Sequence, residues 1–321
     1  MRNVLGCAVA LAALSAVPLA CAQQYPTRLI RYVVPFPPAG STDILARFVA
    51  DKLTPALGHQ VVVENRAGAA GNVGMEFVAK SPPDGYTIVM STAAQFINET
   101  LYTKLSFSLV KDFTAVALIA HVPNVMEVHP SVPAKTVKEF IALARSRPGQ
   151  LNYASSGSGT SIHMSAELFK MMTGVSLLHV PYKGSAPALL DLMTGQVQVM
   201  FDNLPSSMPY LKQDRLRAIA VTTAKRYPGL PELPTIAESG VPGYEAVAAF
   251  GVLAPAGTPR EVVSRLNAEI NRAVKLPDMQ ERFAQQGAIP ATGTPEEYAA
   301  FTRSEIVKWA KVVKDSGAKA E

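Results

Sequence analysis

The stretch PFPPAGSTD (35–43), which follows the apolar run LIRYVV (29–34), decides how the fold is interpreted. An apolar run that ends in a turn containing Pro and Gly is typical of a β-strand. The Ser-Thr-Asp sequence after Gly40 is typical of a helix start. A strand, a tight turn and a helix start together present unpaired backbone N–H groups, which bind anions. The anion is either a nucleotide phosphate, which would indicate an enzyme, or a smaller group held only to be carried.

The rest of the chain repeats this alternation of strands and helices. Ten segments are predicted as strands: 29–34, 60–64, 86–90, 115–120, 125–128, 151–154, 176–180, 197–201, 216–222 and 247–254. Segments with apolar residues three and four apart lie between them, as expected of helices. This order predicts an α/β fold with mixed or mostly parallel sheets flanked by helices.

Three helix starts carry a Thr followed three residues later by Glu. They lie at Thr136, Thr258 and Thr294, and each pattern predicts a reciprocal cap between the two residues. Pro259 and Pro295 are predicted at the first helical position, where a missing N–H costs nothing.

The length of 321 residues and the separate strand series favour two lobes rather than one sheet. The apolar segments 121–129 and 244–255 are the predicted crossings between the lobes. Lobe one is therefore expected to be discontinuous, made of 23–122 plus 250–321, and lobe two to span 123–249.

The N-terminal segment 1–22 has the pattern of an export signal. Residues 1–22 contain Arg2, an apolar stretch and the small-residue ending Ala20-Cys21-Ala22, which predicts cleavage before Gln23. A membrane anchor is the alternative, but the apolar run is short for a spanning helix.

Cysteine usage agrees with export to the periplasm. Cys7 and Cys21 are the only cysteines, so the mature chain is expected to have no thiol and no disulfide. Cleavage before Cys21 would leave a lipid anchor instead. Pro18 stands where an aliphatic residue is expected for that cleavage, so the anchor is the weaker alternative.

Several function classes lack their signatures. The net charge is +5 without any run of five like charges, so no nucleic-acid partner is predicted. The patterns GxxxxGK[ST] and GxGxxG are absent, which argues against a nucleotide site. The histidines are scattered without metal-ligand spacing, so neither a metal nor a cofactor is expected.

Three loops of small polar residues follow predicted strands, at 40–43, 90–98 and 153–163. Each precedes a helix, and in open α/β sheets ligands bind beyond the carboxyl ends of the strands. The loops therefore predict an anion site shared by two lobes. A secreted serine hydrolase using Ser156 or Ser158 is an alternative, but the G-x-S-x-G pattern has Ser156 in place of its first glycine.

Two acidic residues near these loops have two interpretations each. Asp43 either stabilises the dipole of the helix whose first turn it occupies or, in a ligand pocket, accepts a hydrogen bond from a water or an ammonium group. Asp202 either faces the cleft or caps the segment that begins at Asn203.

Taken together, six stretches make the chain resemble the tripartite tricarboxylate transporter substrate-binding receptors (Bug family, TctC-like). These stretches lie at 25–47, 61–74, 81–87, 155–169, 180–203 and 230–245. The resemblance implies a two-lobed periplasmic binding protein of type II-like fold, monomeric and not an enzyme. It would close on a small organic carboxylate and deliver it to the membrane permease subunits of such a transporter. A receptor that docks a membrane signalling kinase is the alternative.

The resemblance also implies which residues bind the ligand. They are Phe36, Gly40, Ser41, Thr42 and Asp43 in lobe one, Thr92, Ala93 and Gln95 in a specificity loop, and Ser156, Gly157, Gly159, Thr160, His163, Tyr182 and Asp202 in lobe two.

The chain departs from the family pattern at two places. Ala39 stands where the family usually has the first glycine of the corner, and a positive φ there would cost alanine about 1 kcal/mol. Ala94-Gln95-Phe96 replaces a stretch that often carries a hydroxyl residue and His, which favours a less polar acid.

Overall fold

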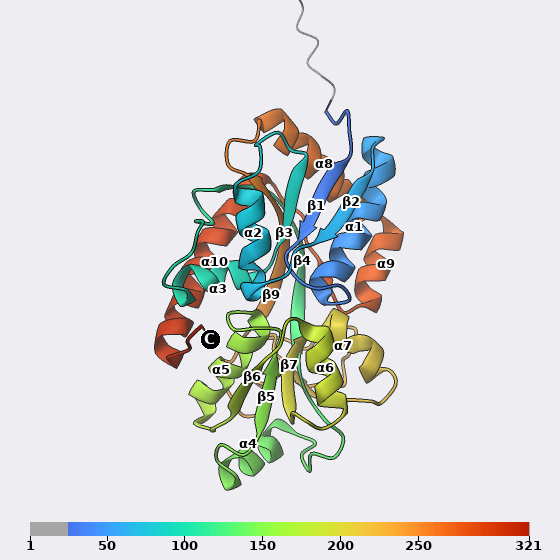
Figure 1. The fold of residues 1–321 in the computed structure, drawn as a ribbon. Coiled ribbons are helices and arrows are strands. Elements are labelled where there is room, and N and C mark those ends of the chain that lie inside the picture. Colours follow the sequence, from blue (N-terminus) through green and yellow to red (C-terminus); the bar gives the residue numbers. More distant parts are fainter. Residues whose placement is uncertain (1–24, 321) are drawn as a thin grey trace, which may run out of the picture.

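A computed structural model describes residues 25–320 as two α/β lobes, one above the other in Figure 1. The predicted signal segment 1–22, with Cys7 and Cys21, lies outside the described residues. Within the described part, no helix is long and apolar enough to cross a membrane.

The upper lobe is built around the strand that precedes the stretch PFPPAGSTD (35–43). Strand β1 (Ile30–Val34) pairs in parallel with β2 (Val61–Asn65) and β3 (Thr87–Ser91). Strand β9 (Val247–Pro255) runs antiparallel to β3 and joins this sheet to β4 (Phe113–Val128).

The lower lobe repeats the parallel arrangement. Strand β5 (Asn152–Ser155) pairs in parallel with β6 (Leu178–Pro181) and β7 (Val199–Asn203). The end of β4 pairs antiparallel with β7 and with β8 (Arg217–Val221). The continuous order is β2-β1-β3-β9-β4-β7-β5-β6.

Strand β4 carries the chain from the upper lobe to the lower one, and the chain returns between Ala246 and the start of β9. The first part of β4, 113–123, pairs with β9 in the upper lobe, and 124–128 pairs with β7 and β8 in the lower lobe. The segments 115–120 and 125–128, predicted as separate strands, therefore form one strand. The short strand β10 (Ile289–Pro290), which was not predicted, pairs with its middle.

Helices cover both faces of the sheet. They are α1 (Ser41–Leu57), α2 (Asn72–Ala79), α3 (Ala93–Leu101), α4 (Val137–Ser146), α5 (Ser161–Thr173), α6 (Ser185–Met193), α7 (Leu204–Leu211), α8 (Arg260–Lys275), α9 (Pro277–Gln285) and α10 (Pro295–Ser316), with a short 3-10 turn at Ala69–Gly71.

Of the three predicted reciprocal caps, one is complete and one is half formed, because the Glu139 carboxylate accepts from the Lys135 N–H instead of the Thr136 N–H. Thr136 Oγ1 accepts from the Glu139 N–H, and Thr294 and Glu297 form a reciprocal capping box. At the third, α8 begins at Arg260 after Pro259, and the Thr258 hydroxyl instead donates to the Pro255 carbonyl. The prediction for Thr258 was wrong because the preceding turn uses its hydroxyl.

Strand β1 shows why the sheet is buried on both faces. Alternate residues of a strand point to opposite faces, and in β1 Tyr32 packs in the cluster with α1, α8 and α9. Val33 packs in the cluster with α2, α3 and α10. With helices fixed on both faces, the carboxyl end of β1 and the start of α1 are held at the boundary between the lobes.

Candidate ligand-binding site

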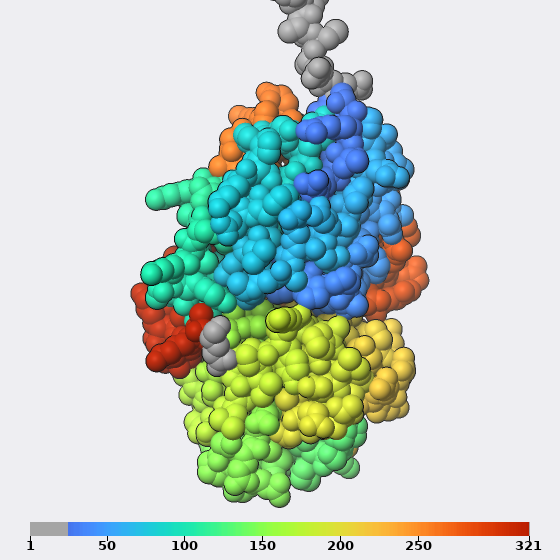
Figure 2. Space-filling view, in the orientation of Figure 1, coloured from blue at the N-terminus to red at the C-terminus, as the bar shows by residue number. Residues whose placement is uncertain are grey.

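A small cavity of about 30 Å³ lies between the lobes. It is lined by Phe36, Pro37, Pro38, Gly40, Ser41, Thr42, Thr92 and Phe250 from the upper lobe and by Ser156, Thr160, Ser161, Gly184, Ser185 and Asn203 from the lower lobe. In the space-filling view the two lobes touch across their boundary (Figure 2).

Five helix N-termini meet at this cavity. Helices α1, α5 and α6 contribute the first residues Ser41, Ser161 and Ser185. Helices α3 and α7 contribute their N-cap residues Thr92 and Asn203. Helix N-termini carry unpaired N–H groups and the positive end of the helix dipole. Among the described residues that line the cavity, none is Lys, Arg or His, so these helix starts supply its positive potential.

Hydrogen-bond partners fix the role of the Ser161 hydroxyl. Its oxygen lies 3.3 Å from Asn203 Nδ2, which donates to it. Asn203 Nδ2 also donates to Asn124 Oδ1 at 2.6 Å. Because the Ser161 oxygen accepts, its hydrogen is available to an anion in the cavity.

A wider groove of about 370 Å³ adjoins the cavity and shares Phe36, Pro37, Ser156 and Gly184 with it. The groove is also lined by the loop 67–71 and by Tyr102, Gly157, Ser158, Pro181, Tyr182 and Lys183. A ligand whose charged end occupies the small cavity therefore has room for its remaining atoms in the groove.

Gln95 lies beside this groove. Its Oε1 accepts from the Thr92 N–H at 2.6 Å, while its buried Nε2 has no hydrogen-bond partner among the described residues. A Cβ built on Gly71, which lines the groove, would lie 2.9 Å from Gln95 Nε2. An unpaired buried donor is costly, so Gln95 Nε2 is a candidate contact for an acceptor in the groove.

The structure separates the predicted site residues into two groups. Those that line the cavity or the groove are Phe36, Gly40, Ser41, Thr42, Thr92, Ser156, Gly157, Thr160 and Tyr182. Those that line neither are Asp43, Ala93, Gln95, Gly159, His163 and Asp202.

Asp43 holds the shape of the corner that precedes α1. Its carboxylate accepts from the Ala39 N–H at 3.1 Å and from Asn65 Nδ2 at 2.9 Å, and it pairs with Arg47 at 2.9 Å. Burial raises the pKa of Asp43, but these donors outweigh burial and lower it overall. Ala39 has φ +66°, so the predicted strained turn is present.

His163 supports the second corner from behind. Its Nδ1 accepts from the Gly159 N–H at 3.1 Å, and its ring stacks on His179 with centroids 4.3 Å apart. Burial lowers the pKa of His163 to about 4 and, with the neighbouring His163, that of His179 to about 3. Both imidazoles are therefore neutral at neutral pH.

Several residues that line the cavity were not predicted from the sequence. Gly184, Ser185 and Asn203 belong to helix starts that follow β6 and β7. Gly184-Ser185 repeats the Gly40-Ser41 pattern after a strand, so the same signal could have identified it. Phe96 is fully buried and packs edge-on against Phe301 with ring centroids 6.1 Å apart, so it belongs to the core.

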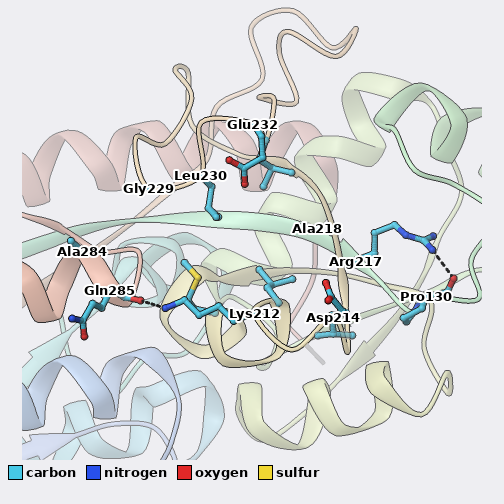
Figure 3. A pocket seen from close by; sticks show the side chains of 14 residues that line it. Pro130, Lys212, Asp214, Arg217, Ala218, Gly229, Leu230, Glu232, Ala284 and Gln285 are labelled. Atoms are coloured by element: carbon cyan, nitrogen blue, oxygen red, sulfur yellow. Dashed lines mark hydrogen bonds between the residues drawn. The ribbon is translucent and has the colours of Figure 1, made fainter.

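A larger cavity of about 620 Å³ lies elsewhere, between α7, β8 and the end of α9 (Figure 3). Its cations are engaged by protein carbonyls, because Lys212 donates to Gln285 and Arg217 donates to Pro130, as the dashed lines show. Met208, Leu211 and other apolar side chains form much of its wall. The helix starts, where donors converge, are therefore the candidate anion site despite the smaller volume there.

Two α/β lobes with a cavity lined by helix N-termini from both define a solute-binding protein. The chain belongs to the tripartite tricarboxylate transporter receptor family: residues 45–318 match the sequence profile described as "Tripartite tricarboxylate transporter family receptor".

Individual relatives agree with this assignment. Protein BugT of Bordetella pertussis is 38% identical over 300 residues, which cover 93% of this chain and 92% of BugT. The solved structure "R. palustris Rpa4515 with adipate" is 44% identical with a TM-score of 0.91, covering 92% of this chain and all of that one. MatC (Rpa3494) from Rhodopseudomonas palustris, solved with bound malate, is 33% identical with a TM-score of 0.86, covering 90% of this chain and all of that one.

Proposed function

We propose that the protein is a periplasmic receptor that captures a small organic carboxylate and delivers it to the permease subunits of a tripartite tricarboxylate transporter. The observation that carries the proposal is the meeting of five helix N-termini at one cavity without a lining cation. Adipate and malate bound to the similar solved structures support a carboxylate ligand.

The ligand carboxylate is assigned to the small cavity. The first N–H groups of α1, α5 and α6 donate charge-assisted hydrogen bonds to it, together with the Ser161 hydroxyl. The rest of the ligand extends along the groove toward Tyr182 and Gln95 Nε2. Gly159, His163, Asp43 and Asp202 act from behind the wall by holding the two corners in shape.

Capture requires the lobes to open and close. Among the described residues, lobe one consists of 25–122 plus 250–320 and lobe two of 123–249, with the hinge beside this boundary, where β4 changes partners after Pro123. Contacts from both lobes to one ligand favour the closed arrangement. The receptor acts as a monomer and performs no chemistry on its ligand. In support, the nearest histidine to Ser158 in the following helix, His163, is engaged by the Gly159 N–H rather than by a serine.

A thermal-shift screen of the mature protein against organic acids tests the proposal. A ligand at a hundred times its dissociation constant stabilises the folded state by about 2.7 kcal/mol. Adipate, malate, longer dicarboxylates, aromatic acids, amino acids and amides form the panel. Stabilisation by at least one acid supports the proposal, and no response to any of them contradicts it. Labelling of Ser156 or Ser158 by a fluorophosphonate would favour a hydrolase instead.

A further inference from the structure

A chain of buried hydroxyl groups joins the two lobes behind the cavity wall. Ser41 Oγ, at the start of α1, lies 3.1 Å from Ser206 Oγ on α7 of the other lobe. Ser206 Oγ lies 2.5 Å from Asp202 Oδ2 at the end of β7. All three residues are buried, with Asp202 fully so.

Counting hydrogens fixes the direction of this chain. Ser206 has one hydroxyl hydrogen, and the charged acceptor at 2.5 Å takes it in preference to the Asn203 carbonyl at 2.9 Å. The Ser41 hydroxyl is therefore the donor to Ser206. Ser185, a cavity residue, donates to Asp202 Oδ1 at 2.7 Å. The Asp202 carboxylate thus orients hydroxyl groups of its own lobe directly and the Ser41 hydroxyl of the other lobe through Ser206.

A second buried carboxyl group, that of Glu127, shares the Ser207 hydroxyl with Asp202. Ser207 Oγ lies 3.0 Å from Asp202 Oδ2 and 2.8 Å from Glu127 Oε1 on the crossing strand β4. Ser207 has one hydrogen for these two acceptors, so a hydrogen on the Glu127 carboxyl satisfies the other contact. Burial, followed by the nearby Asp202 charge, raises the pKa of Glu127 well above its ordinary value. Burial also raises the pKa of Asp202, but the hydroxyl groups of Ser206, Ser185 and Ser207 oppose that rise, whereas only Ser207 does so for Glu127. The proton is therefore assigned to Glu127 and the charge to Asp202, which has more donors.

We propose that Asp202 is a positioning residue for lobe closure: it fixes the Ser206 hydroxyl so that Ser206 accepts the Ser41 hydroxyl from the opposite lobe and holds the cleft shut. Ser206 does not line the ligand cavity, so it does not bind a ligand there directly, and we assign its effect on affinity to closure. The inference rests on the proposed function, because closure matters only if the cleft retains a ligand.

The neighbouring serines provide a matched pair of variants. Ser206 and Ser207 are both buried and both donate to Asp202 Oδ2, but of the two only Ser206 has a hydrogen bond to the other lobe among the described residues. We expect Ser206→Ala to weaken adipate binding about fivefold, mainly through faster dissociation, the usual worth of one neutral hydrogen bond. Ser207→Ala should change the dissociation constant less than twofold although it also lowers the melting temperature.

A double-mutant cycle measures whether Ser41 and Ser206 act on affinity through the same hydrogen bond, which a general loss of stability would not imitate. Ser41→Ala combined with Ser206→Ala should bind adipate no more weakly than Ser41→Ala alone, because the first change already removes the bond. Additive losses in affinity, or equal losses for Ser206→Ala and Ser207→Ala, would overturn the inference. If adipate does not bind the wild type, the acid with the largest thermal shift replaces it.

A second measurement separates this inference from the proposed function. If no acid binds the wild type, the proposed function fails, and lobe separation alone decides the inference. Spin labels at Val73→Cys on α2 and Leu190→Cys on α6, both exposed, report that separation by pulsed electron resonance. Ser206→Ala should shift the distances toward a wider separation than Ser207→Ala does, and identical distributions would overturn the inference.

Discussion

Replacing Ala39 by glycine should stabilise the protein, although glycine usually destabilises. Ala39 has φ +66°, in the left-handed region where a Cβ meets the following carbonyl oxygen. That conformation costs an L-residue about 1–2 kcal/mol, which glycine avoids. Glycine also makes the unfolded chain more flexible, which costs about 0.4–1 kcal/mol. The net expectation is a gain of about 0.5–1 kcal/mol in the free energy of unfolding.

Urea unfolding of Ala39→Gly against a helical control measures this gain. Ala300 is exposed within α10, and Ala300→Gly should lower the free energy of unfolding by about 1 kcal/mol. The two variants should therefore move in opposite directions. The hydrogen bond from the residue 39 N–H to Asp43 survives the change, so ligand affinity should stay within about twofold. A loss of stability in Ala39→Gly equal to that in Ala300→Gly would refute the argument from strain.

Three further predictions follow from the site. Ser161→Ala should weaken carboxylate binding at least about tenfold in calorimetric titration, the worth of a hydrogen bond to a charged group, whereas Ser165→Ala, one turn later and outside the cavity, should not. The ring resonances of His163 and His179 should not titrate between pH 8 and 5 in NMR spectra, and titration of either ring near pH 6.5 would contradict their lowered pKa values. Because the unfolded chain binds these protons near pH 6.5, both groups make the free energy of unfolding fall as the pH drops below that value. Asp43→Asn should lower the free energy of unfolding at pH 7 but much less at pH 3. The reason is that the lowered pKa of Asp43 gives stability that is present above its ordinary pKa and is lost on acidification. An equal loss at both pH values would show that charge is not the cause.

Local patterns in the sequence were sufficient for the parts of the fold that depend on neighbouring residues. Every predicted strand has a counterpart, and the corner before Ser41 has the strained residue at Ala39. The alternation of strands and helices and the Gly-Ser helix starts depend on residues only a few positions apart, so they can be predicted from a single sequence. The continuous strand through Pro123 could not be predicted in this way, because its length depends on pairing with strands from both lobes.

The candidate site shows the same limit more sharply. Asp202 was predicted either to face the cleft or to cap a helix. Instead it accepts hydrogen bonds from the hydroxyl groups of Ser185, Ser206 and Ser207 behind the cavity wall. Nothing local in the sequence distinguishes these roles, since the contact with Ser41 through Ser206 joins residues 165 positions apart. Such roles depend on the packing of two lobes and become visible only in three dimensions.

The most direct test of the account is a crystal structure of the mature protein with the acid that stabilises it most in the thermal-shift screen. The ligand's carboxylate is expected between the N-termini of α1, α5 and α6, within hydrogen-bond distance of the backbone N–H groups of Ser41, Ser161 and Ser185 and of the Ser161 hydroxyl. A carboxylate bound instead in the larger cavity beside Met208 and Arg217, or a ligand without any contact to these helix starts, would contradict it.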